Sequence, residues 1–419
     1  MKAKRFTAIF FLGVLAVFMC LVFAAISIKA AEMLNISSEA INIDWEKLYP
    51  FNESSDHSIQ QEMSKFAYLK DKIEKSTTTR IAGSFKIIEA AKTYEELIGW
   101  NMAAVNDYNP VVRLDDGFLV SLLPSKDISE NAQAVAELDN FCRTLGIKYM
   151  YITAPIKICS SDDKDISGIL DYSNQNTDRF LDAIGKAGVK YYDFRKILHA
   201  DGMNHHEAFF KTDHHWKPET GLWAARHILE FLRDDYGWDV GPEILNPDKF
   251  EYKVYPEWFL GSYGKKITLA RTKPDDFTII YPKFHTHLRF EVPSLGIDTS
   301  GDFSVTYNIS LAERRDYYGL NTYAAYKYAD LSLGKIHNLL SHDGRKILFV
   351  HGSIFNCVIP FTALGIEYTE EIDLRHFTGS LKSYIKTSRP DIVITAYNST
   401  TIGFTKAAKY PNNKFYDFR

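Results

Sequence analysis

The sequence predicts an α/β domain with a mostly parallel sheet, carried on an N-terminal membrane anchor. Apolar runs of strand length, such as Ile147–Thr153 and Lys346–Val350, alternate with segments of helical period from about residue 106 onward. The composition, with 46% hydrophobic and 24% charged residues, is that of a folded globular protein. An uncharged apolar run over residues 6–28 precedes the domain and is long enough to cross a bilayer.

The apolar run at the N-terminus is expected to remain as a signal anchor. Lys2, Lys4 and Arg5 precede it and would stay in the cytoplasm, which places the bulk of the chain in the periplasm or at the cell surface. The run is longer than that of a cleaved signal peptide, and Lys29 disturbs the small-residue pattern of a cleavage site. Secretion after signal cleavage is the alternative.

The chain divides into an anchor (1–31), a membrane-proximal segment (32–105) and the α/β domain (106–419). Within the domain, residues 236–310 follow no clear period and are expected to form an irregular insertion or a lid. Four of the 49 basic residues and none of the 53 acidic residues lie in the anchor, so the exported part carries a formal charge of −8. This acidic balance does not favour nucleic acid as a partner.

The first elements of the domain follow from local signals. Asp116-Gly117 between the segments Val111–Leu114 and Phe118–Val120 predicts a hairpin over residues 111–120. A helix over 130–145 is closed by Gly146, because glycine favours the left-handed conformation that ends helices. Further elements are expected at 147–153 (strand), 177–186 (helix) and 189–194 (strand).

The later elements are predicted in the same way. Pro218 suits the first turn of a helix and Glu219 its positive end, and apolar residues keep a helical period from there to Asp235. Further elements are expected at 277–281 and 287–292 (strands), 346–350 (strand), 355–364 (a short helix that includes Pro360), 381–387 (helix) and 391–396 (strand).

The stretch Asp213-His214-His215-Trp216 concentrates chemically active side chains directly before the helix that begins at Pro218. Asp213 and His215 are separated by one residue and point to the same side of an extended backbone. A histidine beside a carboxylate is the usual general base near neutral pH. Loops that enter helices are a common place for catalytic groups, so this pair is a candidate catalytic site.

Ser353 is the candidate nucleophile for such a base. It follows the strand 346–350 directly, and sites in open α/β sheets form at the carboxyl ends of strands. The backbone N–H groups of Gly352 and Ser353 would stabilise an oxyanion there. A helix N-cap is the simpler explanation of this serine. With Asp213 and His215, however, Ser353 completes the set of groups that a serine nucleophile requires.

The neighbouring histidines and tryptophan have other expected roles. His214 should face away from His215 and is expected to have a structural role or to contact substrate. Trp216 is expected to stack on a sugar ring or to lie in the core. His205 and His206 add to the cluster, but the spacing matches no standard zinc motif. We therefore predict no metal and no cofactor.

The cysteines do not indicate a disulfide framework or a metal module. Cys20 lies in the apolar run, and Cys142, Cys159 and Cys357 are far apart in the sequence without CxxC spacing. One disulfide among the last three is compatible with the sequence, which does not select the pair.

The segment Lys211–Glu219 resembles the signature of the DHHW family, which is related to the J- and X-type alginate O-acetylation proteins. Further segments resemble the family's blocks in the same order, at residues 43–51, 261–265, 346–361, 372–375 and 389–393. The resemblance implies an SGNH-hydrolase-like three-layer fold and an acyl-transfer reaction. It also implies that Asp213, His215 and Ser353 form the triad.

The resemblance implies O-acetylation of a cell-surface or exopolysaccharide. An exported enzyme has no access to cytosolic acetyl-CoA, so a membrane-bound O-acyltransferase is the expected partner that supplies acetyl groups. A carbohydrate acetyl esterase is the alternative within the same chemistry.

One departure from the family pattern supports a hypothesis of a different class. His351-Gly352-Ser353 stands where the family has Gly-Asp-Ser, so the serine is kept while the preceding carboxylate is lost. A catalytically degenerate protein that binds or assembles polysaccharide is therefore the second hypothesis.

Overall fold

The computed structural model describes residues 111–114, 116–158, 171–403 and 414–419. The expected anchor over 6–28 and the membrane-proximal segment 32–105 lie outside these ranges, as does Cys159. Within the described ranges, no helix is both long and apolar enough to span a membrane.

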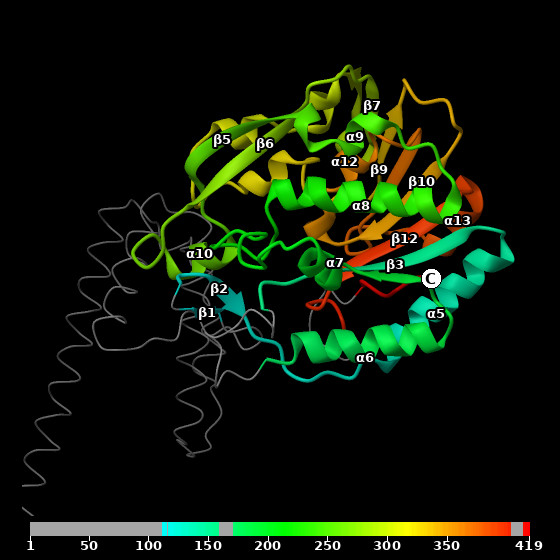
Figure 1. Cartoon of the computed structure of the whole chain (residues 1–419), viewed down its shortest axis with the longest axis horizontal. Coiled ribbons are helices and arrows are strands. Elements are labelled where there is room, and N and C mark those ends of the chain that lie inside the picture. Colours follow the sequence, from blue (N-terminus) through cyan, green and yellow to red (C-terminus); the bar gives the residue numbers. More distant parts are fainter. Residues whose placement is uncertain (1–110, 115, 159–170, 404–413) are drawn as a thin grey trace, which may run out of the picture. The chain divides into compact units, whose positions relative to one another are not determined.

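An eight-stranded sheet in the order β4-β3-β12-β10-β11-β9-β7-β8 forms the centre of the domain (Figure 1). β4, β3, β12, β10 and β11 are parallel, whereas β9, β7 and β8 are antiparallel to their neighbours. The prediction of an α/β fold with a mostly parallel sheet is confirmed. The strand bounds are Tyr191–Asp193 (β4), Lys148–Ala154 (β3), Ile392–Asn398 (β12), Lys346–His351 (β10), Tyr368–Ile372 (β11), Gly334–Asn338 (β9), Leu288–Val292 (β7) and Ile297–Gly301 (β8).

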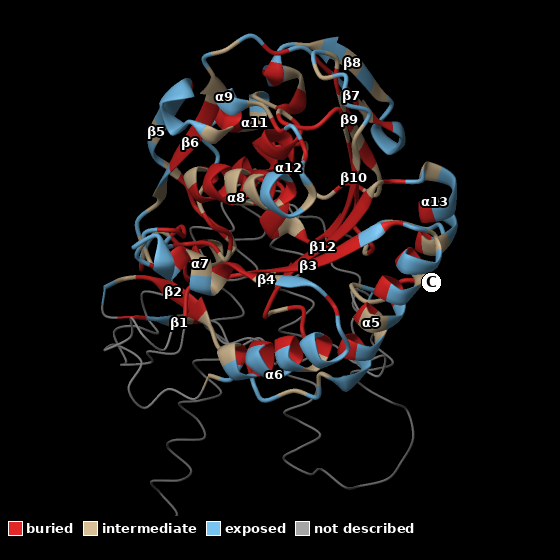
Figure 2. Cartoon of the chain, turned by 45° about the vertical axis from the view of Figure 1, so that its right-hand side comes forward, coloured by how far each residue is buried: buried red, intermediate tan, exposed pale blue. Residues whose placement is uncertain are grey.

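Helices cover both faces of the parallel half of the sheet (Figures 1 and 2). Ile347 and Phe349 of β10 pack on one face and Leu348 and Val350 on the other, as the alternation of side chains along a strand requires. The first face carries α7 (Phe194–Ala200), α8 (Pro218–Tyr236) and α12 (Ile359–Thr362), and the second carries α5 (Ser129–Thr144), α6 (Ser173–Lys186) and α13 (Leu381–Ser388).

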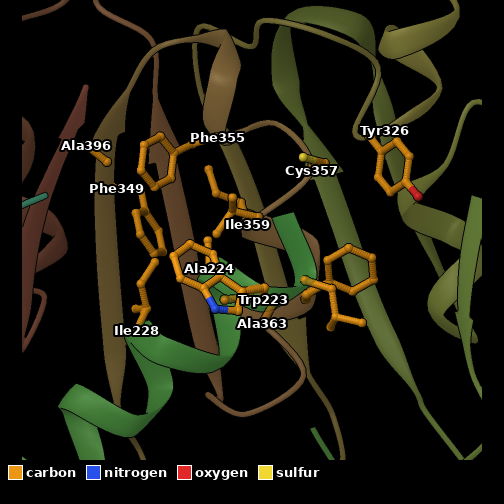
Figure 3. Close-up of a cluster of buried hydrophobic side chains, with 14 of the residues drawn as sticks. Trp223, Ala224, Ile228, Tyr326, Phe349, Phe355, Cys357, Ile359, Ala363 and Ala396 are labelled. Atoms are coloured by element: carbon orange, nitrogen blue, oxygen red, sulfur yellow. The ribbon is translucent and has the colours of Figure 1, made fainter. Parts of the chain in front are cut away.

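Helix α8 is held to the sheet by an apolar face that its sequence period predicts. Trp223, Ala224 and Ile228 lie toward Phe349 of β10 and Phe355 beyond it (Figure 3). Burying a large apolar side chain contributes about 1.5–3 kcal/mol relative to exposing it. This packing fixes the start of α8, and therefore the loop before Pro218, relative to the end of β10.

The mid-chain region is more regular than the sequence predicts. β5 (Phe250–Phe259) and β6 (Asp275–Pro282) form a separate antiparallel pair, joined by α10 (Ser262–Ile267), and β7 and β8 extend the central sheet. β5 was missed because most of its residues are exposed on both sides and show no period of two. β7 reaches the sheet by pairing with β9, which lies far along the chain.

The segment after Ser353 is less helical than predicted. A 3₁₀ turn over Ser353–Phe355 is followed by the short α12 rather than by one helix over 355–364. Pro360 has no N–H group and a fixed φ, so it is accommodated in the first turn of α12. The described chain also contains β1 (Val111–Arg113), β2 (Leu119–Ser121), α9 (Pro242–Leu245), α11 (Ser310–Glu313) and 3₁₀ turns at Pro247–Lys249, Pro293–Leu295, Phe303–Thr306 and Thr322–Ala325.

Candidate active site

The two ends of the loop that contains Asp213 and His215 lie next to each other and are joined by backbone pairing. Phe209 and Trp216 form an antiparallel bridge, and the N–H of Lys217 donates to the carbonyl of Ala208 over 2.9 Å. The intervening residues therefore project as a closed loop directly before α8.

Two ionic groups, the half-buried Asp275 and the buried Lys157, hold the start of this loop. Asp275 accepts hydrogen bonds from the backbone N–H of Lys211 (2.7 Å) and from the N–H (2.8 Å) and hydroxyl (2.6 Å) of Thr212. Lys157 Nζ donates to the carbonyls of Leu119 (2.7 Å) and Lys211 (2.9 Å). Both groups were missed in the sequence because they are remote from the loop and belong to no motif.

Asp213, His215 and Ser353 form one continuous chain of hydrogen bonds. His215 Nδ1 lies 2.5 Å from Asp213 Oδ1, and His215 Nε2 lies 2.8 Å from Ser353 Oγ. The N–H of Ser262 donates to the other oxygen, Asp213 Oδ2, over 2.5 Å. Asp213 and His215 are buried, whereas Ser353 is partly exposed and open to a reactant. The structure thus brings Ser353 to the Asp213-His215 pair across 138 positions of the sequence.

The electrostatics of the loop keep Asp213 ionised. Burial alone would raise the pKa of Asp213, but His214 and His215 and the hydrogen bonds from His215 and Ser262 hold it well below its usual value. An ionised Asp213 accepts a hydrogen bond from Nδ1–H of His215, and this leaves Nε2 as the acceptor for the hydroxyl of Ser353.

Tyr323 supports the imidazole from its face. Its ring is stacked on that of His215, with centroids 4.0 Å apart and an interplanar angle of 17°. Its hydroxyl donates to the carbonyl of Ile354 over 3.2 Å. Tyr323 therefore links the imidazole to the residue that follows Ser353. The sequence analysis did not identify it, because a tyrosine in an aromatic-rich region carries no distinguishing pattern.

The turn at Ser353 supplies backbone donors for an oxyanion, although not the pair predicted. The N–H of Gly352 is directed to the carbonyl of Ala396 at 3.4 Å, because the pairing of β10 with β12 continues to this residue. Among the described residues, the N–H groups of Ser353 and Ile354 have no hydrogen-bond acceptor. These two are therefore the donors that an oxyanion on Ser353 would meet.

Trp216 and His214 differ in what they can contact. Trp216 is fully buried and packs edge-on against Phe355, with ring centroids 5.3 Å apart, so it belongs to the core and cannot stack on a sugar. His214 keeps 35% of its side chain exposed, and its Nδ1 lies 2.9 Å from Ser262 Oγ. Burial is the main cause that lowers the pKa of His214.

Asp213, His214 and His215 also lie close enough together to share a metal ion. Both oxygens of Asp213 already accept hydrogen bonds, and Nδ1 of His215 is bonded to Asp213. A metal ion would therefore have to break the bond between Asp213 and His215. For this reason we do not propose a metal centre here.

Lys157 is expected to make the stability of the fold depend on pH. Burial lowers the pKa of Lys157 from 10.5 to about 7, although Asp275, Asp213 and Asp116 oppose the shift. Between these values the unfolded chain binds a proton that the folded chain does not, so the free energy of unfolding rises with pH. Lys157→Met should lose this rise. Denaturant unfolding of both proteins between about pH 7 and 9.5 measures the difference, and parallel curves would contradict the prediction.

Fold and geometry together define a class: α/β proteins that carry a Ser-His-Asp hydrogen-bonded chain at the carboxyl edge of a parallel sheet. The family comparison agrees, because residues 115–259 match the family described as "SGNH hydrolase-like domain, acetyltransferase AlgX". Residues 115–259 are thus similar to that family, in agreement with the resemblance found in the sequence. The matched residues include Asp213 and His215, and Ser353 lies beyond them.

Solved structures support the fold assignment. A structure of PatB1 from Bacillus cereus with a sulfonyl adduct superposes with a TM-score of 0.62 at 18% identity, covering 75% of this chain and 100% of that chain. A DHHW family protein from Eubacterium siraeum gives a TM-score of 0.52 at 17% identity, covering 73% of this chain and 95% of that chain. No curated protein sequence matches the chain.

Proposed function

We propose that this protein is an extracytoplasmic O-acyltransferase that acetylates a cell-surface or exopolysaccharide through Ser353, His215 and Asp213. The observation that carries the proposal is the continuous hydrogen-bonded chain from Asp213 through His215 to Ser353. The match of residues 115–259 to an acetyltransferase family supports this reaction class over other serine chemistry.

The first half-reaction forms an acetyl-enzyme. Ser353 Oγ attacks the acyl carbonyl of the donor while His215 Nε2 takes its proton, and Asp213 stabilises the resulting imidazolium. The N–H groups of Ser353 and Ile354 stabilise the oxyanion of the tetrahedral intermediate. The intermediate collapses when His215 returns the proton to the leaving oxygen of the donor, which leaves acetyl-Ser353.

The second half-reaction transfers the acetyl group to a sugar. A sugar hydroxyl loses its proton to His215 and attacks the acetyl carbonyl, and the proton returns to Ser353 Oγ as the ester to the enzyme breaks. The product is an O-acetylated sugar and free enzyme. Water in place of the sugar gives the alternative, a carbohydrate acetyl esterase.

A binding-only protein is the remaining alternative, because Gly352 stands where the family has a carboxylate. A Cβ atom at Gly352 would lie 3.4 Å from the ring of Phe415, an ordinary contact. The hydrogen-bonded chain of Asp213, His215 and Ser353, called the relay below, does not involve residue 352. This geometry favours an enzyme.

Labelling of Ser353 tests the proposal directly. The full chain in detergent is incubated with an activated acetyl ester, and its peptides are analysed for acetyl-serine by mass spectrometry. A sulfonyl fluoride is a second probe, since the PatB1 structure of Bacillus cereus is described with a sulfonyl adduct. We expect both groups on Ser353. Ester turnover without modification of Ser353 would overturn the assignment.

Gly261→Ala is expected to lower ester turnover about a hundredfold, because it displaces the carboxylate of the relay. A Cβ atom at Gly261 would lie 2.2 Å from Asp213 Cβ and 2.6 Å from Asp213 Oδ2, so one of the two must move. A misplacement of about 1 Å in a catalytic group costs about this factor. Gly185→Ala on α6 is the control, since its Cβ would meet only the ring of Tyr191, which is 37% exposed. Full activity of Gly261→Ala would contradict the prediction.

We further propose that residues 6–28 anchor the protein in the membrane and that a membrane-bound O-acyltransferase supplies its acetyl groups. The charge pattern before the apolar run and the need for an exported acetyl donor support this arrangement. Carbonate extraction followed by N-terminal sequencing tests the anchor. A soluble mature chain that begins near residue 32 would overturn it in favour of secretion.

A further inference from the structure

A strained backbone segment leads to an acidic side chain beside the candidate active site. Lys327, Tyr328 and Ala329 have φ values of 60°, 62° and 84°, and none of them is glycine. L-residues rarely adopt this conformation, and consecutive residues in it are rarer still. Such strain persists where the surrounding structure imposes it, often at functional sites. Asp330 follows this segment directly.

A fully buried ionic network holds the segment in place. Lys327 Nζ lies 2.6 Å from Glu371 Oε2 on β11 and donates to the carbonyl of Ala329 over 2.9 Å. The same oxygen of Glu371 lies 2.8 Å from Nε2 of His351, two residues before Ser353. Gly334 leaves room for this carboxylate, because a Cβ atom there would lie 2.6 Å from Glu371 Oε1. One network thus connects the strained segment to the end of the nucleophile strand.

Asp330 itself is placed beside the nucleophile turn. Its Oδ1 accepts from Nδ2 of Asn356, three residues after Ser353, and its Oδ2 accepts from Nη2 of Arg375. The side chain of Asp330 is 23% exposed, whereas the side chains of Lys327, Glu371 and His351 are fully buried. Burial would raise the pKa of Asp330, but Arg375, Asn356, Lys327 and His215 together lower it, so Asp330 is ionised.

We propose that Asp330 binds a hydroxyl group of the acetyl acceptor beside Ser353, so that the acceptor is recognised as a polyhydroxylated compound. Each oxygen of the carboxylate uses one lone pair on Asn356 or Arg375 and keeps another for a ligand donor. A hydroxyl donor forms a charge-assisted hydrogen bond there, whereas the acetyl group of a donor ester offers no hydrogen to it. This inference rests on the proposed acetyl transfer and assigns Asp330 to its second half-reaction alone.

Asp330→Asn separates acceptor binding from the rest of the reaction. The amide of Asn356 can turn to present its oxygen, so an asparagine at 330 keeps partners on both sides while the charge is lost. The full chain is supplied with an activated acetyl ester and with glucose, cello-, chito- or mannuronate oligosaccharides. Ester hydrolysis and acetyl-sugar formation are measured together. We expect unchanged hydrolysis without sugar and a ten- to hundredfold loss of transfer, about the worth of one charged hydrogen bond.

Asp298→Asn is the matched control, because Asp298 is also paired with an arginine but lies on β8 at the surface. It should leave both reactions unchanged. An equal loss of hydrolysis and transfer in Asp330→Asn would make Asp330 a positioning residue for the relay and overturn the proposal. Unchanged transfer would overturn it as well, as would a wild-type protein that hydrolyses the ester but acetylates none of the sugars. A wild-type protein without acetyl-Ser353 would instead refute the proposed function. In that case, titration calorimetry of the same sugars against wild type and Asp330→Asn tests the binding claim: weaker binding by the variant supports it, and equal or absent binding overturns it.

Discussion

Ser353→Ala is expected to abolish acetyl-enzyme formation and to slow turnover of an activated acetyl ester by about a thousandfold or more. The hydroxyl is the group that forms the covalent bond, and His215 has no proton to take without it. Removal of a triad nucleophile leaves only the acceleration that oxyanion donors and substrate binding provide. Steady-state hydrolysis and peptide mass spectrometry of the purified variant measure both effects.

Ser262→Ala provides a matched control for this variant. It also removes one hydroxyl beside the relay, the one bonded to His214, while the backbone N–H that donates to Asp213 remains. We expect its turnover to stay within about tenfold of the wild type, the worth of one ordinary hydrogen bond. Turnover of Ser353→Ala equal to that of Ser262→Ala would show that the nucleophile lies elsewhere.

The sequence predicted the residues of the relay because they obey local rules. Asp213 and His215 share a side of an extended segment before a helix, and Ser353 follows a buried strand. In the structure, hydrogen bonds join the three side chains. The residues that hold them, such as Asp275 and Tyr323, act across long separations in the chain. Only the folded chain brings them to the loop, so no local pattern distinguishes them from other acids and tyrosines.

The fold was predictable to a similar extent and for the same reason. Buried strands such as β10 and β12 are continuous apolar runs in the sequence and can be predicted from them. Helix α8 can be predicted from its helical period and from Pro218 in its first turn. β5 was not predicted because its exposed residues have no period, and the place of β7 in the central sheet depends on its pairing with β9. Trp216 could not be assigned from the sequence, since aromatic side chains serve both cores and sugar sites.

The other large expected effect is on stability. Lys327→Met should lower the free energy of unfolding by about 3–5 kcal/mol, because it leaves the carboxylate of Glu371 buried without its cationic partner, with only a contact to His351 remaining. Lys186→Met is the matched control. Lys186 also pairs with a carboxylate, that of Asp182, but both side chains are exposed, and such pairs contribute about 0.5 kcal/mol or less. Denaturant unfolding of the three proteins gives the comparison.

The double variant Lys327→Met/Glu371→Gln distinguishes an unpaired buried charge from lost packing. Replacing the carboxylate removes the charge that Lys327→Met leaves uncompensated, so the double variant should recover part of the stability. If the double variant is less stable than Lys327→Met, the pair matters through packing and through the strained segment that Lys327 anchors.

The same network also reaches the active site. Glu371 contacts His351, which lies two residues before Ser353, so the network that stabilises the fold also constrains the nucleophile turn. Sugar transfer should therefore fall in Lys327→Met even at temperatures where the variant is fully folded, and transfer equal to that of the wild type would show that the network is structural only.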